Sequence, residues 1–299
     1  MNLAIVILNF NTYEKTIECI ESILKTYSEN LTIYVIDNFS NNDSYKILKR
    51  RYEDFNNIYI MKSLENGGYA KGNNIGIKRA IKDKQKYILV CNNDIIFKEN
   101  SIKNMIDLIK NENVHAVGPK ILNEKGNFQK DSLKNKLGFK EKIFVTTPLR
   151  IFDFWNINNK YYYDYLDKSK VLNVYCLSGS CILFKSYVLN EIGLFDERTF
   201  LYEEEPILFR KFNKKGYKAF YQPNSEIIHL HGFTTKSNKA KSFLAFIKSE
   251  KYYCKEYLKI GNIKYFILIF IRCIQYLFRC TNDPNFRKHF KEFLNVVFE

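Results

Sequence analysis

Short, nearly unbroken apolar runs recur through the first part of the chain. Five of them have the length of strands: LAIVIL (3–8), TIYVI (32–36), IYIM (58–61), YILVC (87–91) and VHAVG (114–118). Strands without polar alternation are typical of a parallel sheet that is covered on both faces. Between the first two runs, residues 14–27 repeat apolar side chains at helical spacing. This alternation predicts a doubly wound, mainly parallel α/β sheet, whose ligands bind beyond the carboxyl ends of the strands.

The remaining sequence divides into three parts by composition. Residues 124–170 have no clear period and are rich in Lys, Asn and Tyr, which predicts a variable insertion or flap. The apolar pattern then resumes, strand-like over 174–184, 217–222 and 225–232 and helical over 204–214. We therefore expect one α/β domain over residues 1–235, followed by a helical, basic and aromatic-rich tail over residues 236–299.

The composition is that of a folded, basic protein. Of 299 residues, 46% are hydrophobic and 16% aromatic, which excludes a disordered chain. The formal net charge of +15 favours an anionic partner such as nucleic acid, anionic lipid or a phosphorylated substrate. Seven scattered cysteines form no CxxC pair, so we expect reduced thiols and a cytoplasmic location. The first residues, MNLAIVILNF, lack the features of a signal peptide.

Polar residues cluster where the predicted strands end. Asn9 and Asn11 follow the first strand, Asp37 follows the second, and Asn93 and Asp94 follow the fourth. An acidic residue after the second strand can accept hydrogen bonds from a base or ribose, and it equally fits an Asx turn or helix cap. A carboxylate after the fourth strand can hold Mg²⁺ or Mn²⁺ against a diphosphate, with a surface turn of Asn-Asn-Asp as the structural alternative.

The segment ENGGYAKGNNIGI (65–77) is a glycine-rich loop that opens a predicted helix. Gly68 and Gly72 would let the backbone approach a phosphate or base closely. The spacing matches neither the GxGxxG fingerprint nor a Walker A loop, which disfavours a dehydrogenase and a P-loop enzyme. A glycine-rich loop without a ligand is the structural alternative.

Taken together, these segments resemble the family 2 glycosyltransferases of the GT-A fold, especially their rhamnosyltransferase-like branch. The matching segments are VILNFN, VIDNFSNNDS, ENGGYAKGNNIGI, CNNDI, LSGSCILF, IGLFDERTFLYEEEPILFRKFNKKGY and IIHLHG, which span about residues 3–235. The resemblance implies that Asp37 contacts the nucleobase or ribose. It also implies a group of further residues on the nucleotide-sugar side: Asn9, Asn11, Asn66, Gly68, Gly72, Asn73 and Asn93.

The same resemblance implies a divalent metal ion, Mg²⁺ or Mn²⁺. The DxD-like signature of the family corresponds to Asn92-Asn93-Asp94, so Asp94 would be the main carboxylate on the metal. His229 in IIHLHG matches a histidine that lies near the diphosphate or its metal. His231, two residues further along the predicted strand and on the same side of it, is a second candidate. Two unrelated histidines at an exposed strand end are the alternative.

Three consecutive glutamates, Glu203, Glu204 and Glu205, precede Pro206 in FLYEEEPILFRKF. The resemblance places the family's acidic pair on Glu204 and Glu205, with Glu205 as the catalytic base and Glu204 in contact with the acceptor or the structure. Consecutive helical side chains point about 100° apart, so the three cannot share one site, and we expect Glu203 to be solvated. An acidic helix N-terminus favoured by the helix dipole is the structural alternative.

The implied function is inverting transfer of a sugar from a UDP- or dTDP-linked donor to a hydroxyl of a lipid-linked or protein-linked glycan. This reaction would belong to bacterial surface polysaccharide or glycan synthesis. A nucleotidyltransferase would need a basic, glycine-rich loop soon after the first strand, and NFNTYEK does not supply one. A catalytically inactive GT-A-fold scaffold subunit of a glycosylation complex is the alternative, favoured by the incomplete DxD signature and the Glu-Glu pair.

The tail concentrates positive charge. Residues 236–299 contain 13 lysines and arginines against 5 aspartates and glutamates, a net charge of +8. The longest uncharged run before Arg272 is seven residues (265–271), whereas a membrane-spanning helix needs roughly 20. Aromatic residues between basic ones favour a helix at the inner face of an anionic cell membrane. Packing on the catalytic domain, or on another subunit of a homo-oligomer, fits equally. No nucleic-acid-binding motif is present, so we expect no nucleic-acid partner.

Overall fold

The computed structural model describes residues 2–230 and 239–298. Its strands are β1 (Leu3–Asn9), β2 (Leu31–Asp37), β3 (Ile58–Lys62), β4 (Tyr87–Asn92), β5 (Ile95–Phe97), β6 (Ala116–Leu122), β7 (Leu133–Lys134), β8 (Leu172–Val174), β9 (Cys176–Leu177), β10 (Cys181–Lys185) and β11 (Ala219–His229). Its α-helices are α1 (Tyr13–Thr26), α2 (Ser44–Arg51), α3 (Gly68–Lys82), α4 (Ser101–Ile109), α5 (Phe139–Phe144), α6 (Ile157–Tyr161), α7 (Ser186–Ile192), α8 (Glu204–Lys214), α9 (Lys239–Tyr252), α10 (Asn262–Asn282), α11 (Pro284–Lys288) and α12 (Phe290–Phe298). Short 3₁₀ turns cover Lys130–Ser132 and Pro148–Phe152, and a π-helical segment covers Tyr253–Leu258.

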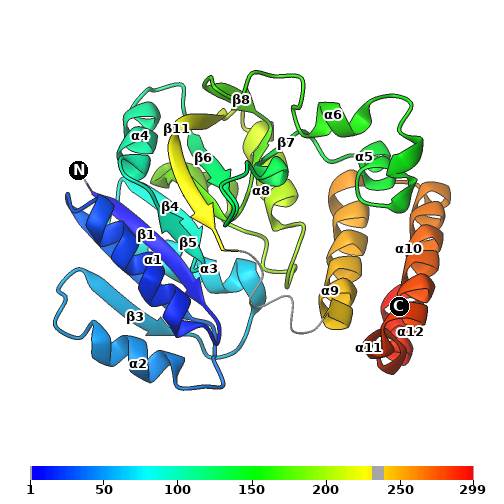
Figure 1. The fold of residues 1–299 in the computed structure, drawn as a ribbon, viewed down its shortest axis with the longest axis horizontal. Coiled ribbons are helices and arrows are strands. Elements are labelled where there is room, and N and C mark those ends of the chain that lie inside the picture. The colour runs from blue at the N-terminus through cyan, green and yellow to red at the C-terminus, as the bar shows by residue number, and fades with distance from the viewer. Residues whose placement is uncertain (1, 231–238, 299) are drawn as a thin grey trace.

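A nine-stranded sheet forms the centre of the molecule, in the order β3-β2-β1-β4-β10-β6-β11-β5, with β8 paired to β11 (Figure 1). Strands β3, β2, β1 and β4 are parallel neighbours. β10 lies antiparallel between β4 and β6, and β5 and β8 are antiparallel to β11. The predicted doubly wound α/β fold is therefore confirmed, and the sheet is mixed rather than mainly parallel.

The apolar strands are buried on both faces, as their sequence indicates. In β1, Leu3, Ile5 and Ile7 belong to a core formed with α1, α2 and α4, whereas Ala4 and Val6 belong to a second core formed with α3, α7 and α8. Strand pairing aligns Asn9 with Asp37, and Leu8 with Asn92. The polar residues that end these three strands therefore meet at one edge of the sheet.

Two predicted strand segments differ in the structure. The segment 174–184 is divided among the end of β8, β9 and β10, and Ser178, Gly179 and Ser180 form the turn between β9 and β10. The segments 217–222 and 225–232 are joined into the single strand β11, as far as the described residues extend. The pairing of β11 with β6 shifts register between Gln222 and Glu226, where Pro223 cannot donate a ladder hydrogen bond.

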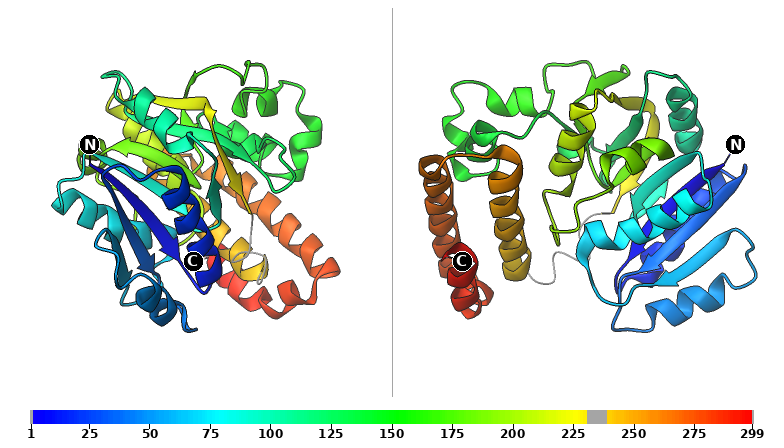
Figure 2. Two further views of the ribbon diagram at one scale, coloured as in Figure 1. Left: turned by 60° about the vertical axis from the view of Figure 1, so that its left-hand side comes forward. Right: turned by 180° about the vertical axis from the view of Figure 1, so that it is seen from behind.

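The C-terminal helices form a layer beside the α/β part, as Figure 2 shows from two directions. α9, α10, α11 and α12 share a small apolar core that includes Leu244, Tyr276 and Phe293. They pack on the rest of the chain through the insertion, where Ile143 of α5 contacts Cys254 and Leu268. The division into residues 1–235 and 236–299 stays a prediction. Across the described residues, no helix combines the length and apolarity of a membrane span.

We expect Gly68→Ala to destabilise the fold strongly. Gly68 has φ +79°, and a Cβ atom there would lie 2.0 Å from the carbonyl oxygen of Phe200. The left-handed backbone costs about 1–2 kcal/mol for alanine, and the overlap adds about 1–3 kcal/mol or more. Gly126→Ala is the matched control, because Gly126 has φ +78° and no atom within 4 Å of an added Cβ. Urea unfolding measures both free energies, and equal losses would refute the role of the Phe200 contact.

Candidate active site

A chain of hydrogen bonds joins the ends of β1, β2 and β4. The Asn9 amide nitrogen donates to Asp37 Oδ2 (2.8 Å), and the hydroxyl of Thr16 donates to Asn9 Oδ1 (2.8 Å). The Asn93 amide nitrogen donates to the hydroxyl oxygens of Thr16 (2.9 Å) and Thr12 (2.8 Å). Asn9, Asp37 and Asn93 are among the site residues predicted from the sequence, whereas the two threonines were not predicted. Thr12 follows Asn11 and directly precedes α1, and Thr16 lies in the first turn of that helix; this spacing of four residues was the available signal.

The same network fixes the loops that follow β1 and β2. The second oxygen of Asp37, Oδ1, accepts from the backbone N–H of Ser40 (3.0 Å), and the Ser40 hydroxyl accepts from the N–H of Asn11 (2.9 Å). Asn9 and Asp37 are fully buried, whereas Asn11 is partly exposed. In this structure Asp37 therefore holds its loop in place, and its predicted contact with a nucleotide stays a prediction.

The glycine-rich loop lies against the end of β2. Asn38, which sequence analysis did not single out, donates from its amide to Asn66 Oδ1 (2.9 Å) and to the carbonyl oxygen of Gly68 (3.2 Å). The N–H of Gly68 donates back to Asn66 Oδ1 (3.2 Å). Asn66 is partly exposed, so this side chain is held in place while one edge of it stays accessible.

The start of α3 packs directly on β1. A Cβ atom on Gly72 would lie 2.4 Å from Leu8 Cδ1, so glycine allows this close approach. Asn73 is fully buried, and its amide donates to the carbonyl oxygen of Tyr69 within the same helix (3.0 Å). These positions bring α3 to the strand ends, and in this structure Asn73 has a packing role rather than an exposed one.

Asp94 and His229 lie together at the end of β4 and β11. His229 Nε2 is 3.1 Å from Asp94 Oδ1, and the backbone N–H of Leu230 donates to the carbonyl oxygen of Asp94 (2.9 Å). His229 Nδ1 lies 3.3 Å from Gln129 Oε1, which orients the ring. The structure brings these two predicted residues together, although their sequence separation is large. His231 lies outside the described residues.

The Asp94–His229 pair fits a divalent metal ion whose remaining ligands come from a bound substrate and water. A carboxylate oxygen and an imidazole nitrogen converge there, and both side chains are only 14% and 10% exposed. Within residues 2–230 and 239–298, no group of three or more His, Cys, Asp or Glu gathers into a complete protein metal site. Mg²⁺ sites commonly combine one or two carboxylates with substrate phosphates and water, and Asp94 supplies one such carboxylate.

Glu205 lies in the first turn of α8, and its position is fixed by the turn between β9 and β10. Its Oε1 accepts from the N–H of Gly179 (2.8 Å) and is 3.6 Å from Lys134 Nζ. A Cβ atom on Gly179 would lie 3.0 Å from Glu205 Cγ, so this approach favours glycine. The hydroxyl of Tyr69 donates to the carbonyl oxygen of Gly179 (2.6 Å). The glycine-rich loop, the turn and Glu205 therefore form one connected unit.

The same turn connects Glu205 to the end of β4. The N–H of Asn92 donates to the carbonyl oxygen of Ser180 (2.9 Å). Asp94 follows Asn92 by two residues, so the turn 178–180 is bonded both to the Glu205 carboxylate and to the strand that leads to Asp94. The Asp94–His229 pair and the Glu205 carboxylate are therefore both connected to the carboxyl end of β4.

Glu203 is not solvated, contrary to the sequence prediction. It is 6% exposed and forms an ion pair with Lys142, which also lies 3.2 Å from Glu250. Arg272 Nε and Nη2 each lie 2.7 Å from a carboxylate oxygen of Glu250. Glu203 has φ +66°, which turns its side chain away from solvent and toward α5 and α9. No local pattern revealed this placement, because all of its partners are distant in sequence.

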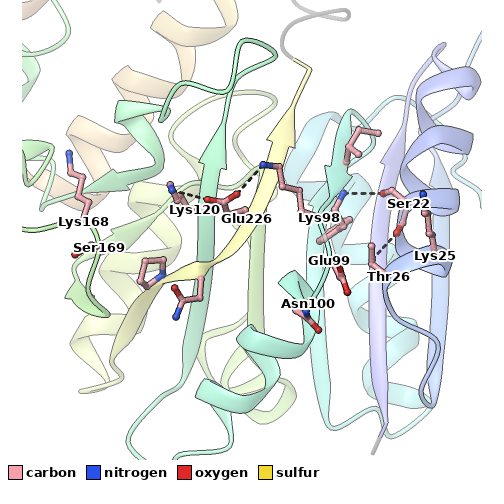
Figure 3. Close-up of a pocket in the computed structure, with 14 residues that line it drawn as sticks. Ser22, Lys25, Thr26, Lys98, Glu99, Asn100, Lys120, Lys168, Ser169 and Glu226 are labelled. Carbon is pink, nitrogen blue, oxygen red and sulfur yellow. Dashed lines mark hydrogen bonds and ion pairs between the residues drawn. The ribbon is translucent and has the colours of Figure 1, made fainter.

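A separate cavity lies between β5, β11 and the end of α1 (Figure 3). Its volume is about 1070 Å³, and its lining includes Lys98, Lys120 and Glu226. Lys98 and Lys120 both pair with Glu226, at 3.0 Å and 2.8 Å. None of the predicted site residues lines this cavity, so its size alone does not make it the active site.

A family model described as glycosyl transferase family 2 matches residues 4–193, which is more than half of the chain. The chain belongs to glycosyl transferase family 2. The matched range contains the strand ends, the glycine-rich loop, Asp94 and Gly179, and it stops before α8 with Glu204 and Glu205.

Curated proteins similar to this family 2 chain include three bacterial transferases. The glycosyltransferase GlyG of Streptococcus pneumoniae is 29% identical over 115 residues, 38% of this chain and 37% of that protein. N-acetylglucosaminyl-diphospho-decaprenol L-rhamnosyltransferase of Mycobacterium tuberculosis is 36% identical over 73 residues, 24% of each. The dTDP-rhamnosyl transferase RfbF of Shigella flexneri is 28% identical over 153 residues, 50% of each. The chain therefore spans half or less of the length of each of these relatives.

Solved structures with the same fold include two metal-bound glycosyltransferases. GalNAc-T7 with UDP, GalNAc and Mn²⁺ has a TM-score of 0.64 at 15% identity, covering 86% of this chain and 49% of the other. The mannosyltransferase PcManGT of Pyrobaculum calidifontis, with GDP-Man and Mn²⁺, has a TM-score of 0.58 at 13% identity, covering 96% and 73%. At these identities the likeness shows the GT-A fold of the family 2 chain and nothing more.

Glu204 should make the stability of this family 2 protein depend on pH. Burial, and then the charge of Glu205, raise the pKa of Glu204 to about 8, and Glu204 Oε2 is buried without a hydrogen-bond partner among the described residues. The protonated form is therefore favoured on folding. The stability that this provides is complete below the unfolded-state pKa and is lost as the pH rises through about 8.

We expect Glu204→Gln to remove this part of the pH dependence. Thermal unfolding of the unchanged protein should show a loss of up to about 1.4 kcal/mol per pH unit between the two pKa values, and Glu204→Gln should lose less. Glu124→Gln, at an exposed loop glutamate, is the matched control. Identical slopes for the unchanged protein and Glu204→Gln would contradict the assignment.

Proposed function

We propose that this protein is an inverting glycosyltransferase, which moves a sugar from a nucleoside-diphosphate sugar to a hydroxyl of a glycan acceptor. The observation that carries the proposal is the connection through the turn 178–180. This turn joins the Glu205 carboxylate to the strand that ends in Asp94 and, through Tyr69, to the glycine-rich loop. Membership of family 2 and the activities for which the relatives are named support the same reaction class.

Glu205 is the proposed base. Gly179 and Lys134 both approach its Oε1, which leaves Oε2 for the proton of the acceptor hydroxyl. As the hydroxyl oxygen bonds to the anomeric carbon, from the face opposite the diphosphate, the bond from that carbon to the diphosphate breaks. The hydroxyl proton passes to Glu205, and no covalent enzyme intermediate is needed. Lys134 offsets the negative charge of Glu205 while the acceptor is bound.

Asp94 and His229 are the proposed protein ligands of Mg²⁺ or Mn²⁺. When bound, the ion would neutralise the charge that grows on the leaving diphosphate. Gln129 holds the His229 ring from its other nitrogen, and the backbone contact with Leu230 fixes the carbonyl of Asp94. These contacts orient the His229 ring and fix the backbone of Asp94 before the donor arrives.

The nucleotide is proposed to bind at the neighbouring strand ends. Asn11 and Asn66 are partly exposed there. Asn38 donates to Asn66, and Asn11 donates to Ser40, which the buried residues Asn9 and Asp37 hold in place. We propose that the exposed amides contact the base or ribose. In this assignment Asp37 orders the loop that carries Ser40, and it affects the ligand only indirectly, through the position of that loop.

The donor is proposed to be UDP- or dTDP-linked, and the acceptor a lipid-linked or protein-linked glycan of a surface polysaccharide. The names of the relatives support this choice, since one acts on a decaprenol-linked sugar and another uses dTDP-rhamnose. We also propose a peripheral location at the cell membrane, because a lipid-linked acceptor is found there and the tail is strongly basic.

Asp94→Ala and His229→Ala should abolish the response to donor in the presence of Mn²⁺. The unchanged protein is incubated with a panel of UDP-, dTDP- and GDP-sugars, and thermal shift and slow donor hydrolysis are recorded. One donor is expected to raise the Tm and be hydrolysed, and EDTA should remove both effects. Asp54→Ala, an exposed aspartate remote from the site, is the control. A full response in Asp94→Ala would refute the metal assignment.

Glu205→Gln should keep the donor-induced thermal shift but lose sugar transfer by about 10²–10⁴-fold, the usual contribution of a general base. The assay follows transfer from the donor found in the panel to a lipid-linked acceptor. Glu124→Gln serves again as the control. Unchanged transfer in Glu205→Gln would exclude this residue as the base. If no donor produced any response in the unchanged protein, the inactive scaffold subunit would be favoured instead.

A further inference from the structure

Helix α10 carries an apolar face that points to solvent. It runs from Ile263 through Phe266, Phe270 and Ile274 to Leu277 and Phe278, whose side chains are between 52% and 80% exposed. Spacings of three, four and seven residues place them along one side of the helix. The opposite side of α10 is already used, because Leu268, Arg272 and Tyr276 are fully buried there. We name the exposed side the outer face of α10.

A second exposed apolar segment adjoins the start of α10. Ile151, Phe154 and Trp155 are between 64% and 81% exposed. The Trp155 ring packs on Phe144 of α5, with ring centroids 5.6 Å apart, and the α5 region shares a small apolar core with α10. Figures 1 and 2 both show α5 and the loop after it at the end of α10 where the helix begins. Apolar surface of this extent marks an interaction site.

The charge around this surface is positive. α10 contains no aspartate or glutamate, and its exposed Lys264 and Arg279 lie near its two ends. Lys255 and Lys259, which precede the helix, are exposed as well, with one exposed acidic residue, Glu256, between them. An exposed apolar stripe bordered by lysine and arginine is typical of a helix that lies in the headgroup region of an anionic bilayer.

A second copy of this chain is a poorer fit to the same surface. Each copy carries a net charge of +15, of which +8 belongs to residues 236–299, so pairing two outer faces would bring like charges together. An anionic bilayer presents the opposite charge and an apolar interior. α10 is also not apolar enough over its length to cross a bilayer, so it would lie along the bilayer surface.

We propose that the outer face of α10, together with the loop of Ile151, Phe154 and Trp155, docks on an anionic lipid bilayer. The apolar side chains enter the acyl boundary, and the flanking lysines and arginines contact the headgroups. This proposal deepens the peripheral location proposed above, and it does not depend on sugar transfer. It also identifies the side of the molecule from which a lipid-linked acceptor would come.

Vesicle co-sedimentation of the full chain tests the proposal. The protein is mixed with phosphatidylcholine vesicles, with and without phosphatidylglycerol, at low and high salt. We expect binding to the anionic vesicles that weakens as salt rises. The double variant Phe266→Ser and Phe270→Ser should bind at least about tenfold more weakly, and Lys264→Glu should reduce binding chiefly at low salt. The double variant Phe55→Ser and Tyr187→Ser, at exposed aromatic residues of the α/β part, is the matched control.

Each outcome decides the proposal. Absence of binding to anionic vesicles, or equal losses in the outer-face and control variants, would overturn it. Light scattering is run in parallel. A dimer that dissociates in the Phe266→Ser and Phe270→Ser variant, without vesicle binding, would make the face an interface between copies and also overturn the proposal. The donor-induced thermal shift is measured without vesicles, so a failure of docking is distinguished from a failure of the proposed function.

Discussion

A buried chain of alternating charges, Glu203–Lys142–Glu250–Arg272, connects four parts of the molecule. All four side chains are at most 6% exposed. Taking such charges out of water costs several kcal/mol each, and removing one partner leaves an uncompensated buried charge at a cost of about 3–5 kcal/mol. The loop before α8, the helix α5 of the insertion, and the tail helices α9 and α10 must therefore assemble together. The acidic residues of the candidate site lie at one end of this chain.

This constraint explains how the Glu205 carboxylate is positioned. Tyr202 and Glu203 both have left-handed backbone conformations, with φ +71° and +66°, and each such residue costs about 1–3 kcal/mol. The ion pair of Glu203 with Lys142 offsets that strain and fixes the residue before Glu204. On the other side, the N–H of Gly179 fixes the Glu205 carboxylate. The proposed base is thus held between the tail and the central sheet.

The fold could be predicted from the sequence where the local pattern of apolar residues determines it. The composition of the candidate site could be predicted only in part. Buried strands such as β1 and the helix over 204–214 follow from apolar periodicity, and strand register then aligns Asn9 with Asp37. The antiparallel direction of β10 was not predictable, because an apolar run does not encode its direction. The prediction that Glu203 is solvated was wrong, because Lys142, which pairs with both Glu203 and Glu250, reaches Glu203 only through tertiary packing. Asn38 was missed for the same reason, whereas Thr12 and Thr16 were missed although their spacing of four residues is visible in the sequence.

Helix α10 buries a charged residue beside Leu268 and Tyr276 and exposes large apolar residues, which is unusual for a surface helix. Arg272 lies in its buried side, paired with Glu250, while Phe266 and Phe270 face outward. A soluble monomer gains nothing from exposed phenylalanine, whereas the buried arginine is needed to complete the charge chain that reaches Glu203. The same rigid helix therefore carries both the last charge of that chain and the apolar outer face. A contact made on the outer face would act on the element that helps to hold the acidic loop, so docking and the position of Glu205 share one structural support.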